Sequence, residues 1–382
     1  MMWLPNSIYR KVLPYKLAQT YKGTFRQKMK YLHFAKMAER NNVVSFRIKR
    51  LADEYTEDWY GVKNVSPEDK EWLCERGYAP RKVGWYGLTK ENCKNYLSDY
   101  VFYRGDTYMD KAFLQLFEHK LNTYMMLAPF KENMPIHYFY LKNHRVLPVG
   151  GETIPYAGVL DLIKNQRIAA KSCRGGHGHG FFKFHYESGN YYLNNRLVTV
   201  GELEKTIDKL DDYILTEYVE QHQLLKELCG SESFPAVIRC ISIYDDTDGP
   251  QLTSSVIRLG SREGGLVTDY HGTIYCGIRI DSGEMFNPIW REDDLTFNRI
   301  QVHPDTKKPL DGVVIPDWQM LKDLILRVSA YLPWTPYLVT DVILTDSGFK
   351  ILEINSHGQA RNCEAHYPFC LNEYQRRQFK IQ

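Results

Sequence analysis

The spacing of apolar residues predicts helices in the first third of the chain and mostly strands in the remainder. Helical spacing, including one or two basic amphipathic helices in the first segment, marks 15–40, 106–126 and 316–332. Alternating apolar and polar residues predict antiparallel strands at 213–219, 234–244, 253–259 and 273–280. Two further stretches predict hairpins, at 167–193 (the glycine hairpin) and 337–355 (the acidic hairpin). The pattern as a whole predicts an α+β protein.

The glycine hairpin contains a loop suited to an anion. A strand-like lead ends near Lys171, and glycines follow at 175, 176, 178 and 180. Glycine tolerates positive φ and a close approach of the backbone, so successive N–H groups can point at one anion. The loop is neither a Walker sequence nor a G-x-G-x-x-G that opens a helix, because an aromatic strand follows it. We interpret it as a hairpin that folds over a nucleoside triphosphate, with an exposed turn as the alternative.

The acidic hairpin places three oxygen-bearing side chains on apolar strands. Asp341 lies in its first strand, while Glu353 and Asn355 lie two residues apart in the second and therefore face the same side. Polar groups in buried strands are costly unless they are paired or bound to a cation. Carboxylate and amide oxygens suit Mg²⁺, which takes a few protein oxygens together with waters and substrate phosphates.

Taken in order, these motifs resemble the ATP-grasp superfamily. A lysine with a glycine-rich hairpin comes first, Glu217 and Glu220 form Glu-x-x-Glu after a strand, and Asp341 precedes Glu-x-Asn. The segments 217–222, 237–239 and 352–355 are most similar to the sugar-transfer associated branch, and the resemblance covers roughly residues 111–363. It implies the ATP-grasp fold, in which two α+β lobes grip ATP. The implied domains are a basic helical region (1–105), a small lobe with the glycine-rich lid (106–215) and a large lobe with the metal site (216–382).

The resemblance also implies roles for individual residues in binding ATP. Lys120, or alternatively Lys111, would reach the α-phosphate side, and Lys171 would hold phosphate beneath the lid. The lid and the segment between the lobes would supply the remaining nucleotide contacts, from Gly175, Gly176, His177 and Gly178 in the lid, from Glu217, Tyr218 and Val219 near adenine, and from Glu220 or His222 at the ribose.

The same resemblance implies the metal and the catalytic cations. Asp341, Glu353 and Asn355 would hold Mg²⁺, whereas Arg239 and Arg258 would approach the γ-phosphate and the acyl intermediate. A salt bridge to a neighbouring strand is the alternative for both arginines.

The implied reaction is ATP-dependent ligation of a carboxylate to an amine through an acyl phosphate. The branch suggests the biosynthesis or modification of a surface polysaccharide, with carboxylate and amine small molecules or glycans as substrates. A kinase that phosphorylates a hydroxyl is an alternative. So is a non-catalytic nucleotide-binding scaffold of a glycan-assembly complex.

Composition adds constraints on partners and compartment. The net charge of +3 over 382 residues argues against nucleic acid as a partner of the whole chain. Residues 1–50 nevertheless hold twelve Lys and Arg against the single acid Glu39, which suggests contact with membrane or anionic glycan, or simply a solvated helical face.

The cysteines and the hydropathy pattern indicate the compartment. Eight cysteines show no CxxC and no zinc-ligand spacing, and no signal or membrane-spanning run is evident, so we expect a cytoplasmic protein. Cys173, beside the glycine loop, is interpreted as a packing residue rather than a nucleophile.

Overall fold

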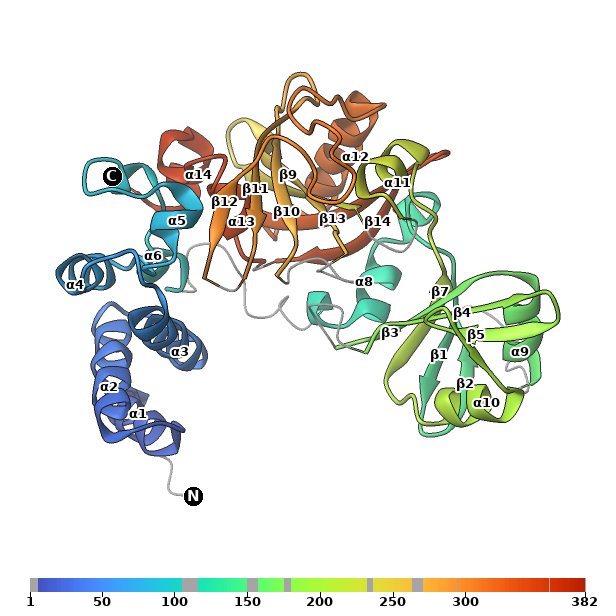
Figure 1. The fold of residues 1–382 in the computed structure, drawn as a ribbon, viewed down its shortest axis with the longest axis horizontal. Coiled ribbons are helices and arrows are strands. Elements are labelled where there is room, and N and C mark those ends of the chain that lie inside the picture. Colours follow the sequence, from blue (N-terminus) through green and yellow to red (C-terminus); the bar gives the residue numbers. More distant parts are fainter. Residues whose placement is uncertain are drawn as a thin grey trace.

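The computed structural model describes residues 6–104, 116–149, 157–174, 180–231, 236–262, 271–293, 295–356 and 358–381. Within these residues the chain forms two seven-stranded antiparallel sheets, with a group of helices from the N-terminal region beside the larger lobe (Figure 1). The prediction of an α+β fold with two lobes is confirmed, and both predicted hairpins are present.

The small sheet has the strand order β2-β1-β7-β3-β4-β5-β6. Its strands are β1 (His137–Lys142), β2 (Arg145–Pro148), β3 (Ile168–Ser172), β4 (Phe182–Glu187), β5 (Asn190–Leu193), β6 (Arg196–Val198) and β7 (Tyr213–Glu217). Two helices, α9 (Ala157–Asn165) and α10 (Val200–Asp208), pack on it. Their apolar residues form one core with alternate strand residues such as Ile168, Phe184 and Leu215, which explains the period of two in the sequence.

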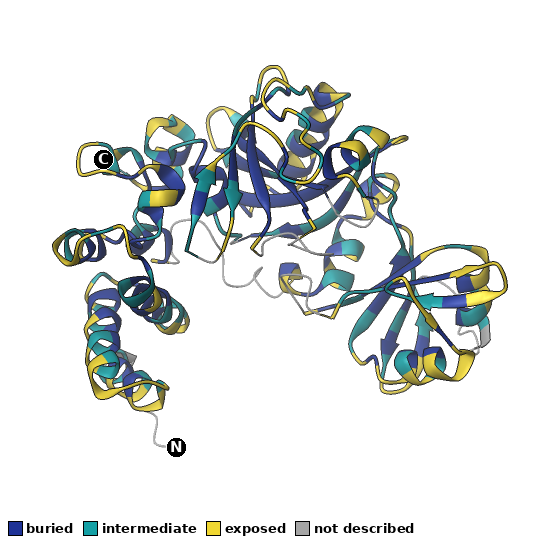
Figure 2. Ribbon diagram, viewed as in Figure 1, coloured by how far each residue is buried: buried dark blue, intermediate teal, exposed yellow. Residues whose placement is uncertain are grey.

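The large sheet has the strand order β12-β11-β10-β9-β8-β13-β14. Its strands are β8 (Ala236–Asp245), β9 (Gly249–Leu259), β10 (Ile274–Ile278), β11 (Met285–Arg291), β12 (Phe297–Arg299), β13 (Tyr337–Thr345) and β14 (Gly348–Asn355). All nine residues of β13 are buried, because the sheet is covered on both faces. Figure 2 shows the central strands of this sheet as the most continuously buried part of the molecule.

Helix α12 (Trp318–Tyr331) covers one face of the large sheet, and its core includes Leu338 and Val342 of β13. Residues from both ends of the chain supply the second cover: the Tyr337 ring of β13 contacts the rings of Phe102 and Phe379, in a core that also holds Val339, Phe34 and Tyr55. Successive residues of β13 thus point into two different cores.

The remaining helices are α1 (Asn6–Thr20), α2 (Phe25–Arg40), α3 (Ser45–Gly61), α4 (Pro67–Glu75), α5 (Lys82–Tyr86), α6 (Asp99–Phe102), α8 (Lys120–Met126), α11 (Gln223–Cys229), α13 (Arg361–Glu364) and α14 (Glu373–Phe379), with short 3₁₀ turns at Cys93–Asn95, Ala128–Asn133 and Phe369–Leu371.

Buried ion pairs also join the N-terminal region to the large lobe. Arg361 of α13 contacts both carboxylate oxygens of Glu54 in α3 at 2.5 Å. Arg361 Nη2 also lies 3.8 Å from Asp99 Oδ1, and within the N-terminal region the same oxygen lies 3.0 Å from Lys82 Nζ, with the Lys82 and Asp99 side chains almost fully buried. Buried charges of this kind require their partners, so these contacts fix the helices on the lobe.

The N-terminal helices differ in extent from the prediction. The basic segment forms two helices, because a capping box between Thr24 and Gln27 starts α2 after the break at residues 21–24. The first helix begins at Asn6 and contains Pro14, whereas the pattern predicted a start near residue 15. The helix expected at 106–126 is described only from residue 116, with α8 beginning at Lys120.

Among the described helices, none combines the length and apolar character that crossing a bilayer requires.

Candidate active site

A cleft is lined by residues of the small sheet, of α8 and of strand β14 of the large sheet. Figure 1 shows α8 beside β14, where the small sheet approaches the large one. Its volume is about 440 Å³, including the part open to solvent. Residues of both sheets line it, namely Phe117, Lys120, Thr123, Met134, Pro135, His137, Lys171, Ile214, Thr216, Ile351, Leu352, Glu353 and Ile354. The two lobes therefore share one site, as the order of the motifs along the chain predicts.

Two lysines converge in this cleft. Lys120 is the first residue of α8, and its backbone N–H donates to the Cys173 carbonyl at 3.0 Å, which places it next to the end of β3. Lys171 lies in β3, opposite Ile214 of β7. Burial, together with the charge on Lys120, lowers the pKa of Lys171 to about 8, while Glu353 opposes the shift. Two neighbouring ammonium groups in a half-buried cleft favour an anion such as phosphate.

Of the two lysine candidates for the first phosphate contact, Lys120 lies within the described residues. Lys120 lines the cleft, with its Nζ 3.7 Å from Glu353 Oε1. Lys111 lies outside the described residues, as do Gly175, Gly176, His177 and Gly178 of the predicted lid.

His137 is a cleft residue that the motif analysis missed. Its ring stacks on Tyr124 with centroids 3.8 Å apart, and its Nδ1 lies 2.7 Å from the Pro135 carbonyl. Burial lowers its pKa to about 4, so the ring is neutral near pH 7 and forms part of a flat wall. In the sequence, only its position in an apolar strand after a proline marks His137 as a possible cleft residue. That position is equally typical of a histidine buried in the core.

The acidic hairpin brings its three oxygen-bearing residues together. Asp341 and Glu353 are register partners, and Asn355 lies opposite Val339, so the three residues share one face of adjacent strands. Glu353 lines the cleft, whereas Asp341 is 5% exposed. Three oxygen donors on one face match the preference of a hard cation such as Mg²⁺. The donor set therefore fits the predicted metal.

Both predicted catalytic arginines contact Asp341. Arg239 binds its two oxygens at 2.8 Å each, and Arg258 Nη2 lies 3.0 Å from Oδ2. Burial opposes ionisation of Asp341, but the two guanidinium groups outweigh it and hold the pKa below its ordinary value. The geometry is that of the predicted alternative, a salt bridge to a neighbouring strand, and neither arginine is among the described lining residues.

Positively charged side chains outnumber negatively charged ones in the cleft and directly behind it. Lys120, Lys171, Arg239 and Arg258 provide four cations, against the carboxylates of Asp341 and Glu353. Such an excess favours a polyanionic ligand, which would bring both charge compensation and oxygen ligands for a metal.

The segment between the lobes lies beside the cleft but not among its described lining residues. Glu217 ends β7, with its Oε1 3.7 Å from Lys350 Nζ, and the N–H of Tyr218 donates to the Arg167 carbonyl at 3.0 Å. Glu220 pairs with Arg167 at 2.6 Å. Val219 lies between these residues and is partly exposed.

His222 has a local structural role in this structure. Its Nδ1 accepts a hydrogen bond of 3.1 Å from the Leu224 N–H and so caps α11, and its Nε2 lies 3.8 Å from Asp346. Of the two predicted ribose contacts, His222 is thus engaged at the turn of the acidic hairpin. Which of Glu220 and His222 meets a ribose stays a prediction.

Comparison with known proteins places these motifs in a family. The model of the family described as sugar-transfer associated ATP-grasp matches residues 105–367. Among curated proteins, no sequence matches this chain.

Several solved structures are similar at low identity. D-alanine–D-alanine ligase from Bacillus anthracis is 14% identical, with a TM-score of 0.32 over 63% of this chain and 57% of that one. N5-carboxyaminoimidazole synthase from Aspergillus clavatus is 11% identical, with a TM-score of 0.34 over 64% and 45%. D-alanyl-alanine synthetase A from Vibrio cholerae is 10% identical, with a TM-score of 0.37 over 69% and 66%. The chain spans about half the length of the first two.

Proposed function

Because the chain belongs to the sugar-transfer associated ATP-grasp family, we propose that it is an ATP- and Mg²⁺-dependent ligase joining a carboxylate to an amine. The family description further supports a role in the biosynthesis or modification of a surface polysaccharide. The observation that carries the proposal is the convergence of Lys120, Lys171 and Glu353 from both lobes in one cleft.

The reaction proceeds through an acyl phosphate. A substrate carboxylate oxygen attacks the γ-phosphorus of ATP and ADP leaves, after which an amine attacks the acyl carbon and inorganic phosphate leaves. Phosphoryl transfer depends mainly on positioning and on compensation of negative charge. Lys120 and Lys171 supply that compensation from the small lobe, where they bind the phosphate chain. The resemblance assigns to the predicted lid the exclusion of water, which protects the acyl phosphate from hydrolysis.

Asp341, Glu353 and Asn355 are the residues that would hold Mg²⁺. When bound, the ion supplies charge neutralisation to the β- and γ-phosphates. Arg239 and Arg258 keep Asp341 ionised, and therefore able to ligate a cation. Arg239 and Arg258, which pair with Asp341 in the structure, are the residues that would bind the transferred phosphoryl group.

The direct test measures ADP and inorganic phosphate release from Mg-ATP against a panel of sugar acids and amines. A ligase releases both products only when a particular acid and amine are present together, and hydroxylamine traps its acyl phosphate. Glu353→Gln should abolish this release. Glu373→Gln is the matched control, because Glu373 is an exposed carboxylate on α14 that contacts only the surface residue Arg377 among the described ion pairs.

Each other outcome refutes the proposal in a different way. ADP release without free phosphate, together with a stable phosphorylated product, identifies a kinase. Tight ATP binding without turnover on any acid and amine pair identifies a nucleotide-binding scaffold. If the Glu353→Gln and Glu373→Gln variants were equally active, the acidic hairpin would have no role in the reaction.

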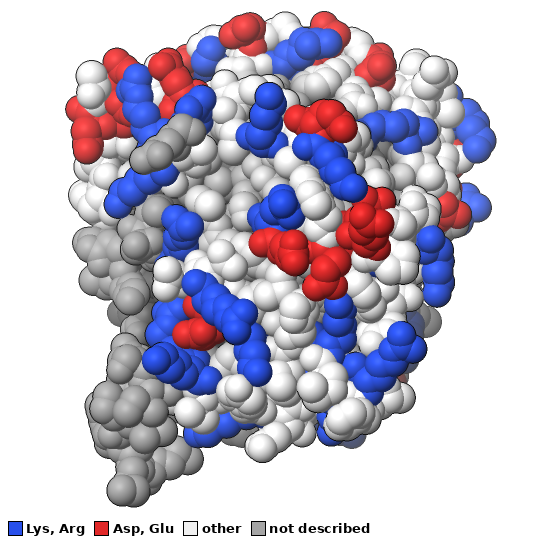
Figure 3. Space-filling view, turned by 90° about the vertical axis from the view of Figure 1, so that its left-hand side faces the viewer, with Lys and Arg blue, Asp and Glu red and all other residues white. Residues whose placement is uncertain are grey.

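We also propose that residues 1–50 contact an anionic membrane or glycan surface. This segment carries twelve basic residues, and the exposed rings of Phe25 (80%) and Phe46 (58%) accompany them. Figure 3 views the molecule from the side of the N-terminal helices, and Lys and Arg side chains predominate in the lower part of that face. Sedimentation with anionic vesicles, compared with neutral vesicles, tests the membrane contact.

A further inference from the structure

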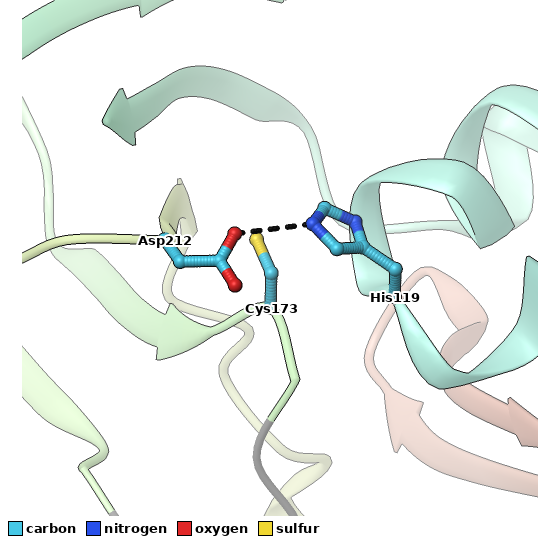
Figure 4. Close-up of side chains that lie close together, drawn as sticks. All are labelled: His119, Cys173 and Asp212. Carbon is cyan, nitrogen blue, oxygen red and sulfur yellow. Dashed lines mark hydrogen bonds and ion pairs between the residues drawn. The ribbon is translucent and has the colours of Figure 1, made fainter. Parts of the chain in front are cut away.

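Three metal-ligating side chains from distant parts of the sequence meet at the base of the glycine hairpin. His119 directly precedes α8, Cys173 directly follows β3, and Asp212 directly precedes β7. One ligand atom from each lies within 4.8 Å of the other two. Figure 4 shows the three side chains pointing toward one another, with the Cys173 sulfur near the line from Asp212 to His119.

Backbone hydrogen bonds hold these residues in place. The Cys173 N–H donates to the Asp212 carbonyl at 2.8 Å, and the Cys173 carbonyl accepts from the N–H of Lys120, the residue after His119, at 3.0 Å. The side chains are also enclosed, because His119 is 7% exposed and Cys173 is fully buried. The site is therefore assembled by the fold and needs no ligand to bring its members together.

Hydrogen bonds also orient the carboxylate. Asp212 Oδ1 lies 3.1 Å from His119 Nε2 and accepts a bond of 2.9 Å from the Tyr140 hydroxyl, while Arg174 Nε lies 3.4 Å from Oδ2. Partners of this kind fix the ligands of metal sites and tune their basicity.

A nucleophilic role for Cys173 does not fit this arrangement. In a Cys-His-Asp triad the imidazole joins the thiol through one nitrogen and the carboxylate through the other. Here Nε2 faces Asp212, and the buried Nδ1 makes no hydrogen bond within the described residues. Burial raises the pKa of the Cys173 thiol to about 12, which disfavours the thiolate that a nucleophile requires.

We propose that His119, Cys173 and Asp212 form a binding site for one transition-metal cation of the Zn²⁺ class. The donor set of one sulfur, one nitrogen and one oxygen suits a borderline-soft ion and would not suit Mg²⁺. Three protein ligands leave a fourth position for water. Metal–ligand bonds of about 2.0–2.3 Å require donor separations of about 3.3–3.8 Å, so side-chain shifts of about 1 Å close the site.

Metal binding would release one proton from the site and shift a second proton within it. The metal displaces the thiol proton to solvent, and the imidazole proton moves to Nδ1, so that Nε2 offers its lone pair. The metal would also fix the two phosphate-binding lysines, since His119 adjoins Lys120 and Cys173 lies two residues beyond Lys171. The site itself does not depend on the ligase reaction.

The experiment titrates the metal-free, full-length protein with Co²⁺ and records its absorption spectrum. Cobalt bound by Cys173 gives a thiolate-to-cobalt charge-transfer band in the near ultraviolet, at one equivalent, and Zn²⁺ abolishes the band by displacement. Cys173→Ser should remove the band and weaken Zn²⁺ binding by more than about 100-fold, beyond the loss typical when a residue that only orients a metal ligand is changed. His119→Gln should weaken binding similarly while keeping the thiol.

Two controls keep the result specific. Cys93→Ser alters a partly exposed cysteine of the N-terminal region and should leave the band intact. Glu353→Gln should also leave it intact, which separates this site from the acidic hairpin. Circular dichroism verifies that each variant is folded. The proposal is refuted if no band forms at one equivalent, if Cys173→Ser retains it, or if Cys93→Ser alone removes it.

Discussion

The lowered pKa of Lys171 predicts how nucleotide affinity depends on pH. Only the protonated ammonium group attracts phosphate, and its pKa of about 8 in the free protein lies near the assay range, whereas an ordinary lysine has a pKa of 10.5. The group is about nine-tenths charged at pH 7 and about one-tenth charged at pH 9. Bound phosphate stabilises the charged form and raises the pKa of Lys171 again. The affinity for Mg-ATP is therefore greatest below pH 8 and falls above it.

The magnitude follows from proton linkage. Above pH 8 the apparent dissociation constant rises about tenfold per pH unit, which corresponds to about 1.4 kcal/mol per unit. Binding at pH 9 takes up about 0.9 proton from the buffer, because the free protein has lost that fraction. Isothermal titration calorimetry in two buffers of different ionisation enthalpy measures both quantities.

Two variants make the measurement decisive. Lys171→Arg keeps a charge at every pH of the experiment, so its affinity profile should be flat between pH 7 and 9 even if its absolute affinity differs. Lys164→Arg, on the exposed face of α9, should keep the wild-type slope. The reasoning fails if wild type shows no proton uptake at pH 9, or if Lys171→Arg retains the same slope.

Two further predictions concern the contact between the N-terminal helices and the large lobe. Arg361→Met should lower the free energy of unfolding in urea by about 3–5 kcal/mol, because it leaves Glu54 buried and unpaired, whereas Arg76→Met at an exposed pair should cost less than about 1 kcal/mol. A loss below about 1 kcal/mol for Arg361→Met would contradict this. Burial raises the pKa of Glu364 from 4.5 to about 7, so the folded state binds a proton that the unfolded state releases. The stability this group contributes is fully present below pH 4.5 and is lost as the pH rises through 7, by up to about 3 kcal/mol. Urea unfolding at pH 5 and pH 8 should show this loss in wild type but not in Glu364→Gln, and parallel changes would refute it.

The local patterns predicted the two lobes well, because strand alternation and the acidic hairpin depend on neighbouring residues. Asp341 and Glu353 were placed on facing strands, and the register pairs them directly. The sequence did not determine which side chains pair with the Asp341 carboxylate. Whether Arg239 and Arg258 bind a phosphate or a carboxylate depends on which strands become neighbours. In the structure both arginines, on β8 and β9, contact the Asp341 carboxylate.

Residues that come together only in the folded structure had no specific signal in the sequence. His137 lies in an ordinary apolar strand, and its place in the cleft depends on how β1 pairs with β7. Cys173 was interpreted as a packing residue, because His119 and Asp212 are far from it in the sequence and no metal-ligand spacing marks them. Cys173 and Asp212 meet because β3 and β7 are neighbours in the sheet, and His119 joins them because the N–H of Lys120 donates to the Cys173 carbonyl.

Because residues of the N-terminal region pack in the core on the second face of the large sheet, we expect that region to evolve together with the family segment. The family match begins at residue 105, yet Tyr337 and Val339 of β13 share a core with residues that precede that boundary, and the Tyr337 ring contacts that of Phe102. A truncation at the family boundary would expose an apolar sheet face next to the cleft, and such a face promotes aggregation. Recombination that exchanged only the family segment would therefore be selected against. The two segments should descend together, and compensating substitutions should link Phe102 with Tyr337, whose rings are in contact.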